Sequence, residues 1–190
     1  MTGKFGDSPD YVIGRGVVAD GSGLFIEDGA LLVSDGKVAE IGPWETVRKD
    51  DVPFYDVEGR LILPGFVNFH HHLYSFFAPG ISPSGPTETF PDILENLWWR
   101  LDRVIDEESL YYSVLMGALD SLSFGVTSVF DHHASMNLDS GSLDIAAEAV
   151  CQAGIRAVLC LETSDRQGKE AMKRQVAENL SFWEKHRSDP

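Results

Sequence analysis

The chain has few cysteines and few basic residues, and it lacks any long hydrophobic run. Its 190 residues include two cysteines and 15 lysines and arginines against 30 aspartates and glutamates, a formal net charge of −15. Nucleic acids and anionic membrane surfaces attract clustered basic side chains, so this charge balance argues against both as partners. No apolar stretch approaches the roughly 18 residues that a membrane-spanning helix needs. We therefore expect neither a nucleic-acid-binding nor a membrane protein.

The N-terminal segment also lacks the apolar core of a secretory signal peptide, which predicts a cytoplasmic protein. Cys151 and Cys160 fall on a predicted helix and a predicted strand without C-x-x-C spacing, which favours buried, reduced thiols. Hydrophobic residues make up 43% of the chain and charged residues 24%, as in ordinary globular proteins. The length suffices for one domain with a sizeable core and part of a second.

Residues 1–63 are predicted to form a small β-sandwich-like domain of short strands and tight turns. Two hairpins are expected in it, one joining Ala30–Val33 to Lys37–Ile41 through Asp35-Gly36, and one joining Phe54–Val57 to Arg60–Leu63 through Glu58-Gly59. This domain is not expected to carry chemistry.

From residue 64 onward the pattern alternates between strand and helix, which predicts a parallel α/β domain over residues 64–190. A first strand is expected to end in His70–His72, and two more are expected at Val126–Phe130 and Ile155–Leu161. Helices are expected at Phe90–Leu101 (with Thr89 and Asp92 as a capping pair), Leu110–Leu122, Leu143–Ala153 and Lys169–His186.

The most informative segment is Leu63–Tyr74, LPGFVNFHHHLY, in which a short apolar strand leads into His70, His71 and His72. Side chains on a strand alternate between faces, so His70 and His72 should point the same way and His71 the opposite way. Two imidazoles on one face can both reach an ion at the Zn–N distance of about 2.0–2.1 Å. A chance polar cluster is the simpler alternative, but the triplet follows apolar residues and precedes an aromatic-rich loop. The pattern predicts His70 and His72 as metal ligands.

Two further polar clusters follow predicted strands, where parallel α/β folds place their chemistry. After the second strand, His132 and His133 are predicted to contact substrate, with Asp131 supporting an imidazole. A turn-forming aspartate beside structural histidines is the alternative. After the third strand come Glu162 and Asp165, for which exposure to solvent is the simpler explanation.

Aromatic residues flank these clusters. Phe76 and Phe77 directly follow the histidines, in a loop placed to cover the site, and are predicted to line the substrate pocket. Trp98 belongs to the apolar stripe of its predicted helix, which favours core packing over stacking on a heterocyclic substrate, and Trp99 falls beside that stripe.

The run from Gly59 to Tyr74 resembles the opening of the amidohydrolase superfamily, metal-dependent deaminases and hydrolases on a (β/α)8 barrel. Three further segments, Leu94–Leu115, Gly125–Ser135 and Gly141–Gly168, are similar to SsnA-type aminohydrolases of the cytosine-deaminase/chlorohydrolase branch. The resemblance implies one divalent transition metal, zinc first and iron as the alternative, and a small-molecule substrate such as a nitrogen heterocycle or an amidine-like compound. It also implies a histidine ligand on strand five, an aspartate ligand on strand eight and a proton shuttle on strand five or six.

Those further residues are expected beyond Pro190, so no catalytic acid or base is assigned within the chain. A (β/α)8 barrel takes about 250 residues, and residues 64–190 supply about half of that. Three or four strands cannot close a barrel, because strand number fixes its diameter. We therefore expect an N-terminal portion of a TIM-like barrel. The full-length protein is expected to be an amidohydrolase or deaminase that hydrolyses non-peptide C–N bonds with a metal-activated water, and it can form a homo-oligomer. The N-terminal portion is expected to be inactive alone.

Two alternatives stay open. A binuclear hydantoinase or dihydropyrimidinase relative would need a carboxylated lysine on strand four, whereas Lys169 and Lys173 fall on the last predicted helix. That strand could itself lie beyond Pro190. The other alternative is a non-catalytic, truncated or split subunit, which the missing half of the barrel suggests.

Overall fold

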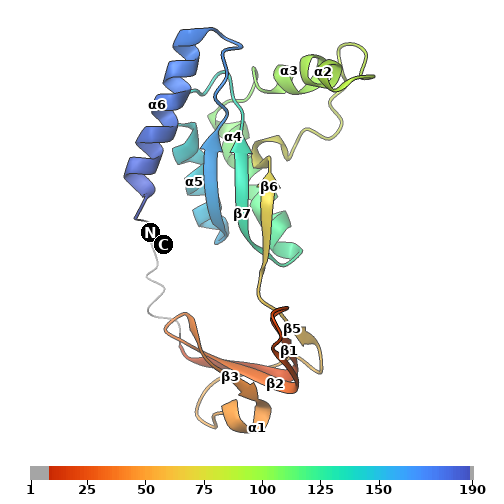
Figure 1. Cartoon of the computed structure of the whole chain (residues 1–190), viewed down its shortest axis with the longest axis vertical. Coiled ribbons are helices and arrows are strands. Elements are labelled where there is room, and N and C mark those ends of the chain that lie inside the picture. The colour runs from red at the N-terminus through yellow and green to blue at the C-terminus, as the bar shows by residue number, and fades with distance from the viewer. Residues whose placement is uncertain (1–8, 189–190) are drawn as a thin grey trace. The chain divides into compact units, whose positions relative to one another are not determined.

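A break in contacts after Pro64 divides the chain into two units, Met1–Pro64 and Gly65–Pro190, in a computed structural model that describes residues 9–188 (Figure 1). The division lies one residue from the boundary predicted by the sequence. The first eight residues, on which the signal-peptide argument partly depends, lie outside the described part. Among residues 9–188, none of the helices combines the length and apolar character that crossing a lipid bilayer requires.

Over residues 9–64, the first unit is one sheet of five strands with a short helix, in place of the predicted β-sandwich-like arrangement. Its elements are β1 (Tyr11–Ala19), β2 (Phe25–Ser34), β3 (Lys37–Pro43), α1 (Trp44–Val47), β4 (Phe54–Asp56) and β5 (Leu61–Ile62). The predicted Asp35-Gly36 hairpin is confirmed, since β2 and β3 pair antiparallel around it. Asp35 and Gly36 have φ angles of 51° and 70°, the positive values that a type I′ hairpin turn requires.

The second predicted hairpin is wrong. Strands β4 and β5 both pair in parallel with β1, with Val12 opposite Phe54 and Val17 opposite Leu61. Glu58 and Gly59 do form a turn with positive φ, so the sequence predicts the local conformation but not the strand with which β4 and β5 pair.

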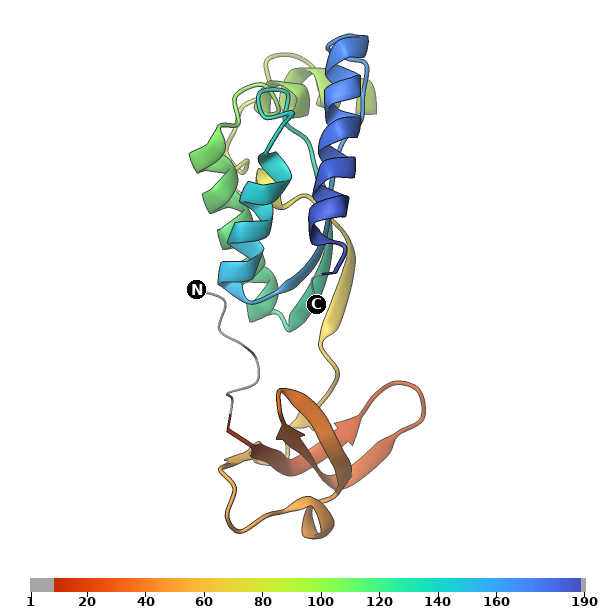
Figure 2. The same cartoon turned by 90° about the vertical axis from the view of Figure 1, so that its left-hand side faces the viewer.

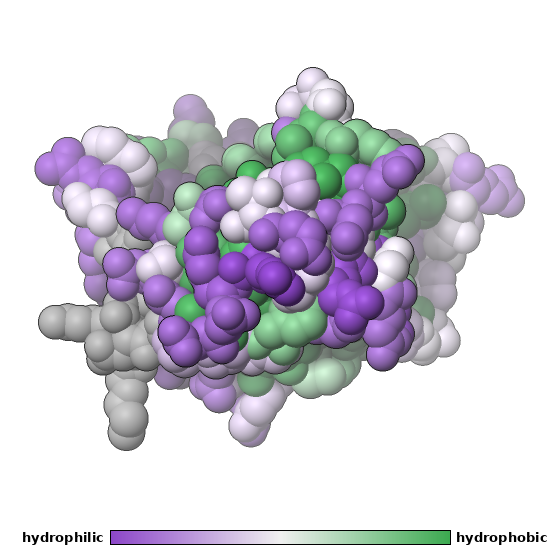
Figure 3. Space-filling view, turned by 90° about the horizontal axis from the view of Figure 1, so that it is seen from below, coloured by the Kyte–Doolittle hydropathy of each residue, from purple (hydrophilic) through white to green (hydrophobic). Residues whose placement is uncertain are grey.

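In the space-filling view of Figure 3, hydrophilic side chains cover much of the visible face and hydrophobic side chains show between them.

The second unit is a three-stranded parallel sheet, in the order β6-β7-β8, with helices against it. Its elements are β6 (Phe66–His71), the 3-10 turn η2 (Leu73–Ser75), α2 (Phe90–Ile93), the π-helical η3 (Leu94–Trp98), α3 (Trp99–Leu101), α4 (Glu107–Ser123), β7 (Val126–His133), α5 (Ser142–Ala153), β8 (Arg156–Leu161) and α6 (Lys169–His186). In Figures 1 and 2, α4 and α5 lie on one face of this sheet.

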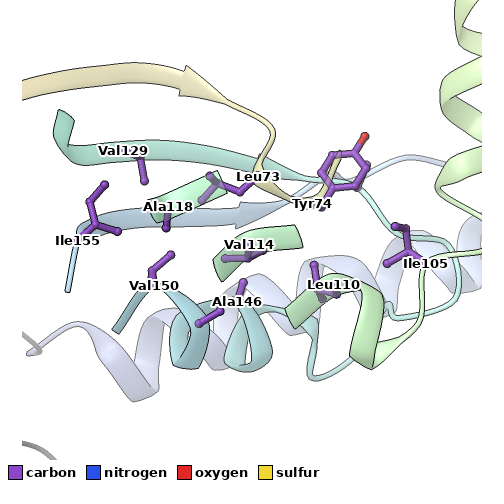
Figure 4. Close-up of a cluster of buried hydrophobic side chains, with 12 residues drawn as sticks. Leu73, Tyr74, Ile105, Leu110, Val114, Ala118, Val129, Ala146, Val150 and Ile155 are labelled. Atoms are coloured by element: carbon purple, nitrogen blue, oxygen red, sulfur yellow. The ribbon is translucent and has the colours of Figure 1, made fainter. Parts of the chain in front are cut away.

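The core of the second unit fills the layer between the sheet and these two helices. Figure 4 shows side chains from α4, α5, β7 and the turn after β6 pointing into this layer. Its fully buried members include Leu73, Leu110, Val114, Ala118 and Ala146. Burying a valine or leucine side chain contributes roughly 1.5–3 kcal/mol, so this layer fixes the carboxyl ends of β6 and β7 relative to α4.

Capping chemistry explains where the helices begin. The predicted pair is confirmed: Thr89 and Asp92 form a reciprocal capping box at the start of α2. Asp106 and Ser109 form a second one at α4. The expected single helix after Thr89 is interrupted by the π-helical η3, which ends at Trp98. The expected burial of both thiols is wrong for Cys151, which is exposed on α5, while Cys160 is half-buried.

The other face of the three-stranded sheet carries exposed apolar side chains. Val67, Phe69 and Val158 are 48%, 70% and 55% exposed. Phe69 stacks on Phe130 with ring centroids 4.7 Å apart, and Phe130 lies beside Val158 in the ladder between β7 and β8. No helix or strand among residues 65–188 covers this face in Figures 1 and 2.

Candidate metal centre

A bulge in β6 shapes the histidine segment. The ladder with β7 pairs Asn68 with Val129 and His71 with Asp131, so two residues of β6 stand where β7 has one. A bulge of this kind re-aims side chains. As a result His70 stacks on His132 of β7, with ring centroids 4.5 Å apart, on the same face as the stacked phenylalanines.

The structure brings His70 and His72 together. Their Nε2 atoms lie 3.0 Å apart and their rings meet edge to face, with centroids separated by 4.8 Å. Two nitrogens bound to one tetrahedral ion at 2.0–2.1 Å stand about 3.3–3.4 Å apart. The pair therefore needs only a few tenths of an ångström of movement to share one ion.

The ring of His72 is held by the backbone of β7. Its Nδ1 lies 2.7 Å from the carbonyl oxygen of His132. A carbonyl oxygen only accepts hydrogen bonds, so Nδ1 carries the proton and donates it. The lone pair of His72 is thereby on Nε2, the atom that faces His70. Histidines that ligate metals are typically held in this way through their other ring nitrogen.

His71 takes the opposite direction, as the alternation predicts. It is half-buried, and the described residues provide no hydrogen-bond partner for its Nδ1. Burial and the neighbouring His72 lower the pKa of His71, while the charge of Asp120 on α4 raises it. His71 thus faces the helix side of the sheet and is separated from the facing pair.

The donor pair fits a metal ion, but it is not a full ligand set. Catalytic zinc sites take three protein ligands and leave one position for water or substrate. Among residues 9–188, no group of three or more histidine, cysteine, aspartate or glutamate side chains is arranged to hold an ion. A divalent ion at His70 and His72 would need further ligands.

The predicted strand β7 is longer than expected and includes the second polar cluster. Asp131, His132 and His133 lie within it and alternate between its two faces. Asp131 is 1% exposed, and its Oδ1 accepts a hydrogen bond from the Leu73 amide at 2.6 Å. Burial raises the pKa of Asp131 to about 6, against the opposing effects of the Leu73 hydrogen bond and the charge of His72. Asp131 is therefore a buried acceptor and does not form a turn.

His133 is buried on the face opposite to His132. Its ring lies edge-on to that of Tyr74, with centroids 5.3 Å apart, and neither of its nitrogens has a hydrogen-bond partner among the described residues. Burial lowers the pKa of His133 to about 4, so the ring is neutral at pH 7. A neutral imidazole offers one donor and one acceptor, and both are unused here.

A cavity of about 420 Å³ opens beside these residues. His72, His132 and His133 line it from the strand ends, Trp98 and Trp99 from the helical segment, and Glu162 from the end of β8. The core-packing interpretation of Trp98 is therefore wrong, because Trp98 is half-buried, lines the cavity and lies outside the buried cluster of the second unit. Phe76 and Phe77 do not line this cavity; Phe76 lies against Gly117 of α4, and Phe77 is 55% exposed.

Sequence reasoning missed a buried charge network in the cavity wall. Asp102 is 2% exposed and accepts hydrogen bonds from Tyr74 Oη and from both terminal nitrogens of Arg166, each at 3.2 Å. Arg166 also bonds Glu162 at 2.6 Å and lies over the Trp99 ring, 4.9 Å from its centroid. Glu162 is exposed, as expected, and it also pairs with Arg166. Asp102 and Arg166 stand 64 residues apart, and no local spacing pattern signals such a pair.

The buried His133 predicts an acid-dependent loss of stability. Its pKa of about 4 in the folded chain lies below the ordinary 6.5, so protons bind more tightly to the unfolded chain. The contribution of the neutral ring is complete above pH 6.5 and is lost as the pH falls toward 4, by about 3 kcal/mol in total. We expect His133→Gln, followed by urea unfolding between pH 4 and 7, to flatten this fall. Parallel curves for the two proteins would contradict the prediction.

Comparison with known proteins places this chain in a family. The profile of the Amidohydrolase family matches residues 61–188. The 5'-deoxyadenosine deaminase of Methanobrevibacter smithii is 30% identical over 158 residues, which cover 83% of this chain and 34% of that enzyme. The chain spans about a third of the length of the curated relatives that it matches.

Solved structures show the same α/β fold. E. coli guanine deaminase superposes with a TM-score of 0.74 at 22% identity, over 94% of this chain and 43% of its own. An adenosine deaminase from Xanthomonas campestris with bound zinc gives 0.72 at 22% identity, over 96% of this chain and 41% of its own. The resemblance read from the sequence is confirmed: the chain belongs to the Amidohydrolase family.

Proposed function

We propose that this chain supplies the first metal ligands of a hydrolase that acts on non-peptide C–N bonds, deaminating a small nitrogen heterocycle or an amidine-like compound. The observation that carries the proposal is the approach of His70 Nε2 and His72 Nε2 to 3.0 Å, with the His72 proton held on Nδ1. Relatives named as deaminases of adenosine compounds and guanine, and a structural neighbour with bound zinc, support it.

The proposed cofactor is one divalent transition ion, zinc first and iron second, because imidazole nitrogen suits both. When bound, the ion supplies Lewis-acid activation of a water molecule. His70 and His72 hold it at the strand end. The carbonyl of His132 keeps the His72 ring in the tautomer whose Nε2 carries no proton.

The cavity next to the histidine pair is the proposed substrate site. Trp98 and Trp99 give it flat apolar walls suited to a planar heterocycle. His132 and His133 bring ring nitrogens that lack partners among the described residues, and these can hydrogen-bond to substrate nitrogens. Phe76 and Phe77 are left out of the proposal, because neither lines the cavity.

The proposed activity requires the remaining barrel strands. The exposed apolar face of the β6-β7-β8 sheet supports this requirement. Strand side chains inside a barrel are normally packed in layers, whereas Phe69 is 70% exposed. We place the other metal ligands and the catalytic acid or base on those strands. On this proposal the described chain alone is inactive.

The experiment compares this chain with a longer polypeptide that contains it together with the remaining strands. We expect the longer polypeptide to bind about one transition ion per chain and to release ammonia from adenosine, 5'-deoxyadenosine or guanine. Chelation should stop the release and zinc should restore it, while the 190-residue chain, as the control, releases none. Metal content by mass spectrometry below one ion per longer chain, or chelator-resistant ammonia release, would end the proposal.

A further inference from the structure

Two consecutive residues of β7 hold the end of the histidine segment. The carbonyl oxygen of His132 accepts the Nδ1 proton of His72 at 2.7 Å, and Oδ1 of Asp131 accepts the amide proton of Leu73 at 2.6 Å. The first contact fixes the ring of His72, and the second fixes the peptide group that directly follows it. Both anchors belong to one strand, so their spacing is set by its backbone.

The Asp131 contact takes the place of a missing ladder bond. The register of β6 on β7 shifts between Phe66 and Val67 and again at the bulge before His71, and β6 ends at His71. The Leu73 amide would be buried without a partner if no side chain reached it, since Leu73 is 0% exposed. A strand end held only by the bulged ladder would leave the direction of the His72 ring weakly determined.

Among the described residues, the side chain of Asp131 makes no second hydrogen bond. Its Oδ2 is buried without a hydrogen-bond partner among the described residues, and no basic side chain pairs with it there. A buried carboxylate is costly unless its contacts repay the loss of hydration. Because burying the Asp131 carboxylate is unfavourable, its place beside the histidine pair indicates a role that an apolar side chain could not perform.

We propose that Asp131 is a positioning residue, which holds the His72 imidazole in the direction and tautomer that metal binding needs. The inference rests on the proposed function, because it assigns His72 to the metal. Asp131 acts through the Leu73 amide and the backbone and does not touch the ion. Only Oδ1 makes the contact on which this role depends.

Two substitutions separate the hydrogen bond from the charge. Asp131→Asn removes the negative charge and keeps an Oδ1 acceptor, whereas Asp131→Leu removes both at similar volume. We expect Asp131→Leu to weaken Co²⁺ binding to the longer polypeptide by about 10–100-fold and to alter the ligand-field absorption of bound Co²⁺. Asp131→Asn should stay within about threefold of the unaltered chain, with the same spectrum. If the leucine variant does not fold by circular dichroism, Asp131→Ala takes its place.

A second measurement does not need metal. Long-range ¹H–¹⁵N correlation spectra of histidine rings in the metal-free chain report which ring nitrogen carries the proton. We expect His72 to be protonated on Nδ1 in the unaltered chain and in Asp131→Asn, and to become a mixture of tautomers in Asp131→Leu. A side chain that only filled space would lower the thermal midpoint and leave this tautomer unchanged.

The outcomes distinguish a failure of the positioning role of Asp131 from a failure of the proposed function. Equal weakening by the asparagine and leucine variants would show that only the charge of Asp131 matters and would overturn the positioning role. An unchanged tautomer and Co²⁺ spectrum in Asp131→Leu would overturn it as well. If the unaltered chain shows the Nδ1 tautomer and its loss in Asp131→Leu, but a longer polypeptide binds no metal, the proposed function fails while the positioning of His72 stands.

Discussion

His70→Ala and His72→Ala should each weaken Co²⁺ binding to the longer polypeptide by more than about 100-fold, beyond the roughly 10–100-fold effect of residues that only support a ligand. The two Nε2 atoms face each other at 3.0 Å, so removing either ring removes half of the donor pair. His71→Ala is the matched control. It deletes an imidazole from the same tripeptide, but that ring faces the helix side of the sheet, and we expect less than about a threefold change.

The measurement is a titration with Co²⁺ in competition with a chelator of known affinity, followed by absorbance. Circular dichroism of each metal-free variant checks the fold, because His71 is half-buried beside α4. In a longer polypeptide that releases ammonia, the same His70 and His72 variants should abolish the release while His71→Ala retains most of it. Equal losses at all three positions would overturn the assignment of faces.

The parts of this fold that could be read from the sequence are those decided by neighbours along the chain. Helix α6 has the predicted bounds, Lys169–His186, because its apolar spacing continues without interruption. The Thr89 and Asp92 capping box and the Asp35-Gly36 hairpin follow from side chains within three residues of each other. The facing of His70 and His72 likewise follows from the period of a strand.

The parts that could not be read depend on which distant segments meet. The turn at Glu58-Gly59 has the conformation its sequence favours, yet β4 and β5 both pair with β1, because hydrogen-bonding partners are chosen by the whole sheet. The bulge before His71 is invisible in the sequence for the same reason. Trp98 lies in an apolar stripe as expected, but that stripe lines a cavity whose other walls come from distant segments.

The candidate site shows the same division. The sequence supplied His70, His72, His132 and His133, all at strand ends, and the structure lines the cavity with three of them. It did not supply Asp102, which lies just beyond the short α3 and meets its partners only through the fold. A buried ion pair across 64 residues is visible only when the chain is folded.

Removing Asp102 should be among the most destabilising substitutions in this chain. Asp102→Leu leaves the Arg166 guanidinium, 16% exposed, with Glu162 as its remaining acid partner, and deprives Tyr74 Oη of its acceptor. Breaking a buried pair by removing one partner costs about 3–5 kcal/mol. Arg166→Met should cost less at acid pH than at neutral pH, because burial already raises the pKa of Asp102 and a protonated Asp102 needs no cation.

Urea unfolding of both single variants and of the double variant tests this prediction. Replacing both partners by apolar side chains of similar volume is often neutral, so the double variant should be more stable than Asp102→Leu alone. Lys173→Ala is the matched control, because its ion pair with Glu170 is 67% and 78% exposed and such pairs contribute at most about 1 kcal/mol. If Asp102→Leu unfolds within about 1 kcal/mol of the unaltered chain, the pair is not a structural element of the cavity wall. A large loss that the double variant does not recover would assign the cost to Tyr74, since Tyr74 is the partner left without an acceptor in both proteins.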